Sequence, residues 1–314
     1  MTVHALIKHQ APARPVLRWH GGKWRLAPWI IGHFPTHRIY VEPFGGAASV
    51  LLRKDRSYAE VYNDLDDVVV NLFRVLRDRA KADRLLQQLR LTPFARREFD
   101  DALNVTDDDV ERARHLVVRS FMGFGSNAHS SSPVAEKTAF KTHTRPKDEY
   151  RSTGFRANSN RSGTTPAHDW MNYPDGLERI IDRLRGVIIE HRDARQVMSQ
   201  HDGGATLHYV DPPYMPETRS PANKYDLKHR MYRHELTPDD HRELLEFLRG
   251  LDGMVLLSGY AHPLYDEMLP DWRRLTCKAF ADGARERTEV LWLNPRCVAA
   301  LDAERQQRSL FAAL

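Results

Sequence analysis

The sequence predicts an α/β protein in which a sheet domain is interrupted by a second, mainly helical domain. Short apolar runs of strand length alternate with helical patterns at both ends of the chain. A mostly helical, then loop-rich and basic segment lies between them. Alternating strands and helices are typical of a sheet that is covered by helices. We expect residues 1–70 and 186–300 to form the sheet domain, residues 71–185 the inserted domain, and residues 301–314 a C-terminal tail.

The N-terminal part of the sheet is predicted from two short apolar runs. Residues 38–41 are expected to form a buried strand that runs into Glu42-Pro43-Phe44-Gly45-Gly46, followed by a short helix over residues 47–53. Residues 58–62 predict a second strand, which ends at Asn63. A strand, a glycine turn and a helix in this order are typical of nucleotide-binding α/β folds, because glycine lets the backbone approach a ligand. A plain tight turn needs no ligand, so that interpretation stays open.

Asp64 follows the second predicted strand. It lies about 20 residues beyond the glycine turn, the offset at which an acidic side chain meets ribose hydroxyls in nucleotide-binding folds. Asp64 can instead cap the helix that we expect over residues 65–79. The two interpretations are compatible.

The middle of the chain is predicted to be helical and then irregular. Helical patterns run from residue 66 to residue 119, and Asp107-Asp108-Asp109 favours a helix start within this stretch. Gly123 is expected to end that helix. Residues 126–165 are polar and basic, which favours loops. A further helix is expected from Pro174 to Arg185.

The C-terminal half returns to the alternating pattern. Thr237 is followed by a proline and two acids, which together predict the start of a helix that ends near Gly250. The last two apolar runs predict a hairpin. The strands expected here cover residues 186–190, 205–210, 254–257, 272–280 and 288–293.

The positive charge of the chain is concentrated in one segment. The whole chain carries a net charge of +5, whereas residues 112–161 hold ten Lys or Arg and three acids, a net charge of +7. Such a segment indicates either a polyanion-binding surface or a solvated basic face. No apolar run approaches membrane-spanning length, and Cys277 and Cys297 show no metal-binding spacing. These features favour a cytoplasmic globular protein with no metal site.

The tetrapeptide Asp211-Pro212-Pro213-Tyr214 ends the apolar run of residues 205–210. Proline lacks a backbone N–H, so two prolines in a row stop the pairing of the strand. A carboxylate, a backbone carbonyl and an aromatic ring then stand beyond the strand end. The two oxygens can accept both protons of an exocyclic amine while the tyrosine stacks on the flat ring that carries it. A simple Asp-Pro turn is the alternative.

Several classes of nucleotide-binding and hydrolytic protein are excluded or disfavoured. His20-Gly21-Gly22-Lys23 lacks the upstream glycine and the following Ser or Thr of a P-loop, and Phe44-Gly45-Gly46-Ala47 is not the dinucleotide-binding pattern. The Gly-x-Ser-x-Gly elbow of α/β-hydrolases does not occur. The Pro-Cys-x-x-Cys pair of zinc deaminases is also missing.

Four motifs in a specific order resemble the Dam-like DNA adenine-N6 methyltransferases, a family of the D12 class and α-group, and most closely its phage-type members. The resemblance extends from about Leu17 to Asn294. It implies a Rossmann-like methyltransferase sheet, mixed and ending in a C-terminal hairpin, with an inserted, mainly helical and loop-rich target-recognition domain. The four motifs are Trp19-His20-Gly21-Gly22-Lys23, Glu42-Pro43-Phe44-Gly45-Gly46-Ala47, Asn63-Asp64 and Asp211-Pro212-Pro213-Tyr214.

The resemblance implies a role for each matching residue. The cofactor would be S-adenosyl-L-methionine, which leaves as S-adenosyl-L-homocysteine, and no metal would take part. Catalysis would rest on Asp211, Pro212, Pro213 and Tyr214. The cofactor-binding residues would be Trp19, Lys23, Phe44, Gly45, Gly46, Asp64, Asp193 and Asp211. His20 and the glycine turn depart from the common family pattern, which affects the details of the cofactor contacts.

The partner implied by the resemblance is double-stranded DNA, from which the enzyme would flip an adenine before methylating its N6 amine. Residues 119–127 lie where the family places DNA contacts but do not match its best-known members, so the target sequence does not transfer. The enzyme would be cytoplasmic and act at the bacterial nucleoid, and a prophage origin fits the phage-type resemblance. The expected DNA-binding residues are Arg119, Ser126, Asn127, Lys137, Lys141, Arg145, Arg156 and Lys224.

The C-terminal pentapeptide Gln307-Arg308-Ser309-Leu310-Phe311 resembles short peptides that dock on the bacterial sliding clamp. The favoured alternative is the end of an amphipathic helix that packs on its own domain.

Three other functions stay open at this point. A cytosine-N4 methyltransferase acts on a similar amine, but that class usually has Ser where Asp211 stands. An RNA or protein-amide methyltransferase is disfavoured by the basic insertion and the order of the motifs. A catalytically silent DNA-binding protein of the same fold is disfavoured because all four motifs are intact.

Overall fold

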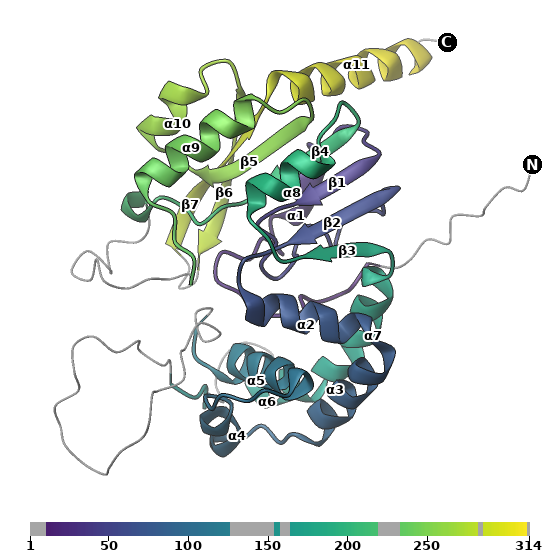
Figure 1. Cartoon of the computed structure of the whole chain (residues 1–314), viewed down its shortest axis with the longest axis vertical. Coiled ribbons are helices and arrows are strands. Elements are labelled where there is room, and N and C mark those ends of the chain that lie inside the picture. Colours follow the sequence, from purple (N-terminus) through teal and green to yellow (C-terminus); the bar gives the residue numbers. More distant parts are fainter. Residues whose placement is uncertain (1–10, 126–153, 158–163, 219–232, 282–284, 313–314) are drawn as a thin grey trace, which may run out of the picture.

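The computed structural model describes residues 11–125, 154–157, 164–218, 233–281 and 285–312. Its described strands form one seven-stranded sheet in the order β3-β2-β1-β4-β5-β7-β6 (Figure 1). Strands β1 to β5 pair in parallel, whereas β7 pairs antiparallel with both β5 and β6. The mixed sheet with a C-terminal hairpin is therefore confirmed. The strands are β1 (Ile39–Glu42), β2 (Ala59–Asn63), β3 (Val187–Glu190), β4 (Thr206–Val210), β5 (Met254–Tyr260), β6 (Arg273–Ala281) and β7 (Arg285–Leu293).

Several helices begin where a side chain satisfies one of their free N–H groups. Asp108 accepts a hydrogen bond from the backbone of Glu111, and Thr237 forms a capping box with Asp240. No described helix is both long and apolar enough to cross a membrane. The described helices are α1 (Ala27–Ile31), α2 (Asp67–Arg77), α3 (Arg79–Leu91), α4 (Arg96–Asp101), α5 (Asp109–Met122), α6 (Pro166–Met171), α7 (Tyr173–Leu184), α8 (Ala194–His201), α9 (Pro238–Arg249), α10 (Pro263–Met268) and α11 (Pro295–Ala312).

Each strand of the sheet sends alternate side chains to two different layers, because side chains alternate across a strand. Tyr40 of β1 packs in the core that contains buried residues of α2, α3, α5 and α7. The next residue, Val41, packs with α8, α9 and α10 on the other face. In Figure 1, α8, α9 and α10 lie in front of the sheet, whereas α2 to α7 form a group beyond its β3 edge. The sheet therefore has an apolar core on each of its two faces.

The helices between β2 and β3 share their core with the sheet. Leu85 of α3, Leu116 of α5 and Ile180 of α7 belong to the same cluster of buried residues as Tyr40 and Leu207. The segment is thus inserted in the sequence, yet its buried core is continuous with that of the sheet. Its assignment as a separate target-recognition domain stays a prediction.

The helix expected over residues 47–53 is wrong. This stretch forms a series of turns, in which Ala48 has a positive φ of 52°. The backbone N–H of Leu51 donates to the side-chain Oε2 of Glu42 at 2.9 Å. That N–H is therefore unavailable for a helical hydrogen bond, and the left-handed residue at position 48 also interrupts the helical path.

The C-terminal residues 301–312 belong to α11, whose first half packs on the core through Cys297 and Leu301. At its other end, the side chains of Leu310 and Phe311 are each 69% exposed. The interpretation that these two residues pack on their own domain is therefore wrong for the described part of the chain. Docking on a sliding clamp stays a prediction.

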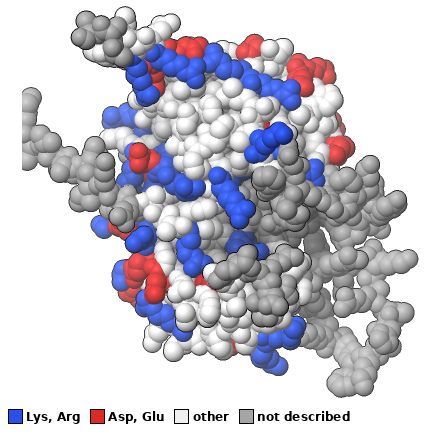
Figure 2. Space-filling model, turned by 180° about the vertical axis from the view of Figure 1, so that it is seen from behind, with Lys and Arg blue, Asp and Glu red and all other residues white. Residues whose placement is uncertain are grey.

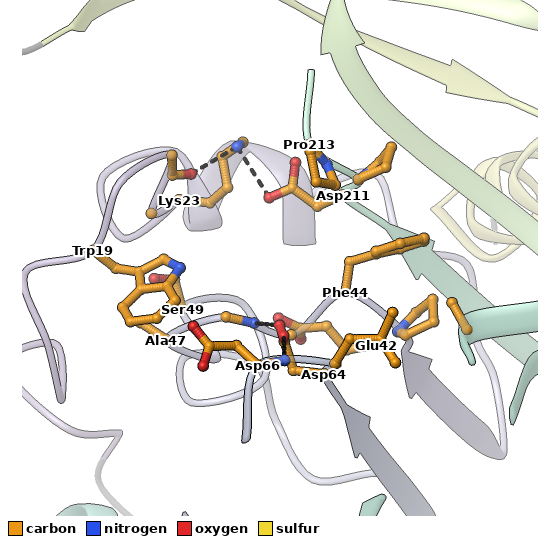
Figure 3. Close-up of a pocket in the computed structure, with 18 of the residues that line it drawn as sticks. Trp19, Lys23, Glu42, Phe44, Ala47, Ser49, Asp64, Asp66, Asp211 and Pro213 are labelled. Carbon is orange, nitrogen blue, oxygen red and sulfur yellow. Dashed lines mark hydrogen bonds and ion pairs between the residues drawn. The ribbon is translucent and has the colours of Figure 1, made fainter. Parts of the chain in front are cut away.

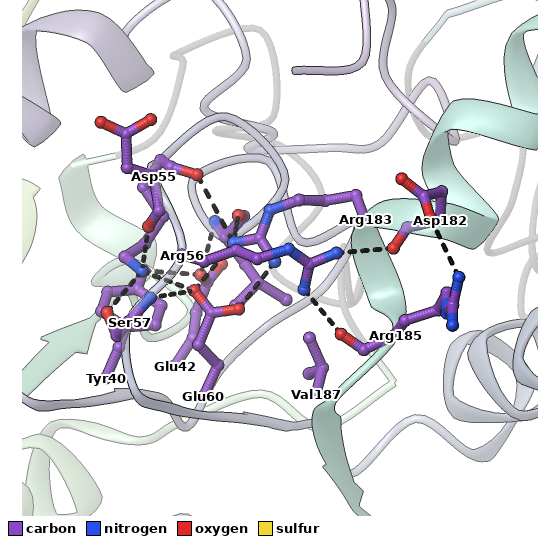
Figure 4. Close-up of polar contacts among 12 residues, drawn as sticks. Tyr40, Glu42, Asp55, Arg56, Ser57, Glu60, Asp182, Arg183, Arg185 and Val187 are labelled. Carbon is purple, nitrogen blue, oxygen red and sulfur yellow. Dashed lines mark hydrogen bonds and ion pairs between the residues drawn. The ribbon is translucent and has the colours of Figure 1, made fainter. Parts of the chain in front are cut away.

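A buried cluster of charges joins β2 to α7 (Figure 4). Glu60 of β2 is 3% exposed and accepts hydrogen bonds from both terminal nitrogens of Arg183, at 2.7 and 2.8 Å. Lys54 Nζ lies 2.6 Å from the same carboxylate. Burial alone would raise the pKa of Glu60, but the hydrogen bonds from Arg183 and the charges of both cations hold it below its ordinary value.

We expect Glu60→Ala to lower the free energy of unfolding by about 3–5 kcal/mol, because Arg183 and Lys54 would stay buried without their shared carboxylate. The measurement is chemical denaturation followed by circular dichroism. Arg79→Ala removes a cation from an exposed pair with Asp83 and should leave the unfolding midpoint close to that of the wild type. Equal midpoints for the two variants would contradict the role assigned to the buried cluster.

Candidate active site

A pocket opens at the carboxyl ends of β1, β2 and β4 (Figure 3). In open α/β sheets, ligands bind at the carboxyl ends of the strands. The site lies where the connections that leave two adjacent strands lead towards opposite edges of the sheet. β1 lies between β2 and β4 and ends at this pocket. Most of the predicted catalytic and cofactor-binding residues meet here. Those that line the pocket are Trp19, Lys23, Phe44, Gly45, Gly46, Asp64, Asp211, Pro212 and Pro213.

The glycine turn gives this pocket a wall of bare backbone. Gly46 has a positive φ of 46°, which a residue with a side chain adopts only with strain. A Cβ atom on Gly46 would lie 2.7 Å from Nε1 of Trp19, and a Cβ on Gly45 would collide with the ring of Tyr62. Both positions therefore require glycine. The turn predicted from the sequence brings the backbone to the edge of the pocket, with Trp19 beside it.

Asp64 is held in the pocket by two backbone N–H groups. Its Oδ2 accepts from Gly46 at 2.7 Å, and its Oδ1 accepts from Asp66 at 2.8 Å. Burial raises the pKa of Asp64 to about 6. The interpretation that Asp64 caps the following helix is wrong, because Asp66 caps α2 by accepting from the backbone of Val68. Asp64 is thus left facing the pocket.

The carboxylate of Asp211 is held between two donors. Lys23 Nζ lies 3.0 Å from its Oδ2, and the hydroxyl of Ser258 donates to its Oδ1 at 2.6 Å. Lys23 is itself fixed by the carbonyl of Gly21 at 2.8 Å. The Asp211 side chain therefore has a defined orientation at the end of β4.

Tyr214 lies behind the pocket as the structure describes it. Its ring sits 4.6 Å from Lys23 Nζ and meets Tyr260 edge-on. Its hydroxyl donates to Glu289 Oε2 at 2.8 Å, and the residue is 9% exposed. Tyr214 thus braces Lys23 and the wall of the site in this arrangement. Its stacking on a substrate ring stays a prediction.

Three buried polar residues of the site were not predicted from the sequence: Glu42, Ser258 and Glu289. A signal was available for Glu42 and Ser258, because each interrupts or ends an otherwise apolar strand, and a polar group in such a place needs a partner. Glu289 follows four polar residues in β7, so it gave no such signal. Glu42 Oε2 accepts from the Tyr40 hydroxyl at 2.7 Å and from the backbone of Leu51 at 2.9 Å. Burial, with Asp211 adding to the effect, raises the pKa of Glu42 to about 8.

Asp193 lies at the N-terminus of α8 and is not among the described residues that line the pocket. Its carboxylate accepts from the backbone of Arg195 and Gln196, which caps the helix. The next residue, Ala194, does line the pocket. A contact between Asp193 and the cofactor stays a prediction.

The predicted DNA-binding residues are only partly described. Arg119 is 6% exposed, and its Nη1 donates to the carbonyl of Ala102 at 2.7 Å. A phosphate contact would require this side chain to leave that position. Arg156 is half-buried, and its backbone N–H donates to Met122 at 2.7 Å. The remaining ones lie outside the described residues: Ser126, Asn127, Lys137, Lys141, Arg145 and Lys224.

Comparison with known proteins identifies the family. Residues 19–274 match the family model of the D12 class N6 adenine-specific DNA methyltransferases. The chain belongs to this family. The matched residues include Lys23, the glycine turn and Asp211, whereas α11 follows them in the sequence.

Several DNA adenine methylases are similar to this D12 class chain. The protein from Serratia marcescens is 36% identical over 205 residues, which cover 65% of this chain and 67% of the relative. The protein from Haemophilus influenzae is 27% identical over 169 residues, which cover 49% of this chain and 57% of the relative. The Escherichia coli K12 protein is 35% identical over 77 residues, or 24% of this chain and 27% of the relative. The chain thus spans little more than half of the Haemophilus relative.

We expect Glu42→Gln to stabilise the protein increasingly as the pH rises from about 5 to about 8. The pKa of Glu42 is about 8 in the folded protein and 4.5 in an ordinary glutamate, so the wild type loses stability across this interval as a buried charge forms. Glutamine keeps the acceptor for Tyr40 and never ionises. The gain should reach a few kcal/mol, at roughly 1.4 kcal/mol per pKa unit.

The measurement is the unfolding free energy of both proteins at pH 5 and pH 8 by urea denaturation. A difference between variant and wild type that does not change with pH would contradict the raised pKa of Glu42.

Proposed function

We propose that the chain is a site-specific DNA methyltransferase that moves a methyl group from S-adenosyl-L-methionine to the N6 amine of adenine. The observation that carries this proposal is the Asp211 carboxylate, fixed by Lys23 at 3.0 Å beside the glycine turn and Asp64 in one pocket. A carboxylate that can accept an amine would thus lie next to an edge that can bind a nucleotide. Family membership and the names of its relatives support adenine as the base.

The residues of the pocket fit the proposed cofactor. Gly45 and Gly46 bring bare backbone to the edge of the pocket beside Trp19, and the Asp64 carboxylate can accept from ribose hydroxyls. Asp64 and Asp211 make the pocket acidic, which suits a sulfonium cation. Phe44 adds an aromatic face to the lining. When bound, the cofactor supplies an electrophilic methyl group.

The acceptor chemistry follows from Asp211 and the Pro212 carbonyl. Adenine N6 is a poor nucleophile, because its lone pair is delocalised into the ring. Two oxygens that accept its two N–H bonds favour a pyramidal nitrogen, whose localised lone pair points away from them. Because this amine is hidden in a base pair, the base must first be flipped out of the duplex. Holding the flipped base in place then contributes much of the rate.

DNA contacts are proposed mainly for the basic residues that the structure does not describe. Figure 2 shows Lys and Arg spread over the back of the molecule. In the basic segment, however, Arg112 pairs with Asp67 at 2.6 Å and Arg114 with Glu98 at 2.8 Å. These two cations are engaged within the protein. The helices and loops between β2 and β3 would form the target-recognition part, and Arg233 places one cation at the pocket itself.

The setting proposed for this activity is the bacterial cytoplasm, where chromosomal DNA lies. The exposed Leu310 and Phe311 at the end of α11 favour docking on a protein partner such as the sliding clamp.

We expect Asp211→Ala to reduce methyl transfer to adenine by at least about 10³-fold, because it removes an acceptor needed at the moment of transfer. Binding of S-adenosyl-L-methionine, measured by calorimetry, should stay within a few-fold of the wild type. Asp266→Ala removes an exposed carboxylate on α10 and should leave the activity unchanged.

The readout is mass spectrometry of nucleosides from DNA treated with labelled cofactor. N4-methylcytosine in place of N6-methyladenine, each identified against its nucleoside standard, would establish the N4 alternative. The absence of any methylated base with the wild type would favour the silent DNA-binding protein.

We also expect DNA binding to weaken steeply with salt, by at least about tenfold between roughly 50 and 200 mM, because Lys and Arg release counterions from phosphates. Fluorescence anisotropy of a labelled duplex measures this. The affinity for S-adenosyl-L-methionine should change little over the same range. A DNA affinity that is insensitive to salt would contradict the phosphate contacts.

A further inference from the structure

Ser258 lies beside the catalytic tetrapeptide although it follows it by many residues in the sequence. It belongs to β5, which pairs in parallel with β4, and Val210 is the register partner of Leu257. The residues that follow these partners, Asp211 and Ser258, therefore emerge side by side at the same edge of the sheet. Ser258 is 2% exposed, so its hydroxyl has no access to bulk water.

The hydroxyl of Ser258 makes two hydrogen bonds whose direction can be deduced. It donates to Asp211 Oδ1 at 2.6 Å, and its Oγ lies 3.2 Å from the hydroxyl of Tyr209. A serine hydroxyl has one proton, which goes to the carboxylate. Tyr209 is therefore the donor to Ser258. The three groups form a directed chain from Tyr209 through Ser258 to Asp211.

This chain restricts the rotation of the Asp211 carboxylate. The terminal torsion of an aspartate has a broad preference, so the side chain alone does not define the plane of its oxygens. Lys23 holds Oδ2 from the loop before α1, and Ser258 holds Oδ1 from β5. Each carboxylate oxygen has two lone-pair positions, so each keeps one for a substrate N–H. The two donors therefore orient the carboxylate and leave each of its oxygens able to accept a further hydrogen bond.

We propose that Ser258 is a positioning residue for methyl transfer, which holds the Asp211 carboxylate in the plane in which it accepts the substrate amine. The inference rests on the proposed function of Asp211. It assigns a role to a hydroxyl on β5, outside the motifs that point to the cofactor and the base.

The test compares Ser258→Ala, which removes the hydroxyl, with Ser258→Thr, which keeps it. Steady-state methylation of a duplex measures kcat and KM, and calorimetry measures cofactor affinity. Ser258→Ala should lower kcat roughly 10- to 100-fold, the range expected when a catalytic group is slightly misplaced. KM for DNA and the cofactor affinity should stay within about threefold. Ser258→Thr should recover most of the lost kcat.

Ser199→Ala is the matched control, because it removes an exposed serine hydroxyl on α8. It should behave as the wild type. A wild-type kcat for Ser258→Ala would overturn the proposal, as would a Ser258→Thr variant that recovers nothing. A joint loss of kcat, cofactor affinity and thermal stability in Ser258→Ala would also overturn it, since that result marks a purely structural role. Methylation of adenine by the wild type is measured before any variant is compared. If the wild type methylates no adenine, the proposed function itself fails.

Discussion

The arrangement of the sheet and the pocket depends on the ion pairs that the buried carboxylate of Glu60 forms. Arg183 lies at the end of α7, just before the chain enters β3, and donates to Glu60 (Figure 4). Lys54 reaches it from the turns that follow the glycine turn. Removing a carboxylate and two cations from water is costly unless each is paired. The turns before β2 and β2 itself are therefore held to Arg183 at the end of α7, 123 residues after Glu60 in the sequence.

The same cluster leads to the pocket through short contacts. Arg183 Nη2 also donates to the carbonyl of Leu51 at 2.6 Å, and the N–H of Leu51 donates to Glu42. Glu42 lines the pocket that contains Asp64 and Asp211. Several acids gather here around one lysine, and burial raises the pKa of both Glu42 and Asp64. Such crowding costs stability and is typical of functional sites, where groups are placed for chemistry.

Three parts of the chain build the proposed catalytic centre. The tetrapeptide at the end of β4 would supply the groups that face the substrate, whereas Lys23 and residues of β5 and β7 orient them. Ser258 donates a hydrogen bond to Asp211, and Glu289 accepts one from the hydroxyl of Tyr214. The antiparallel hairpin at the end of the chain thus does more than extend the sheet. It brings a buried acceptor behind the aromatic ring that supports Lys23.

Local patterns in the sequence determined the strands, the capping of α5 and α9, the glycine turn and the tetrapeptide, because each depends on neighbouring residues. The four ordered motifs also determined the family. Only the tertiary structure decided that residues 47–53 form turns, that the Asp64 carboxylate accepts from the backbone of Gly46, and that Ser258 belongs to the site. Each of these outcomes rests on a hydrogen bond or a strand register set by the packing of the folded chain. Periodicity and residue preference carry no information about such contacts, since the partner is chosen by the sheet and not by the adjacent sequence.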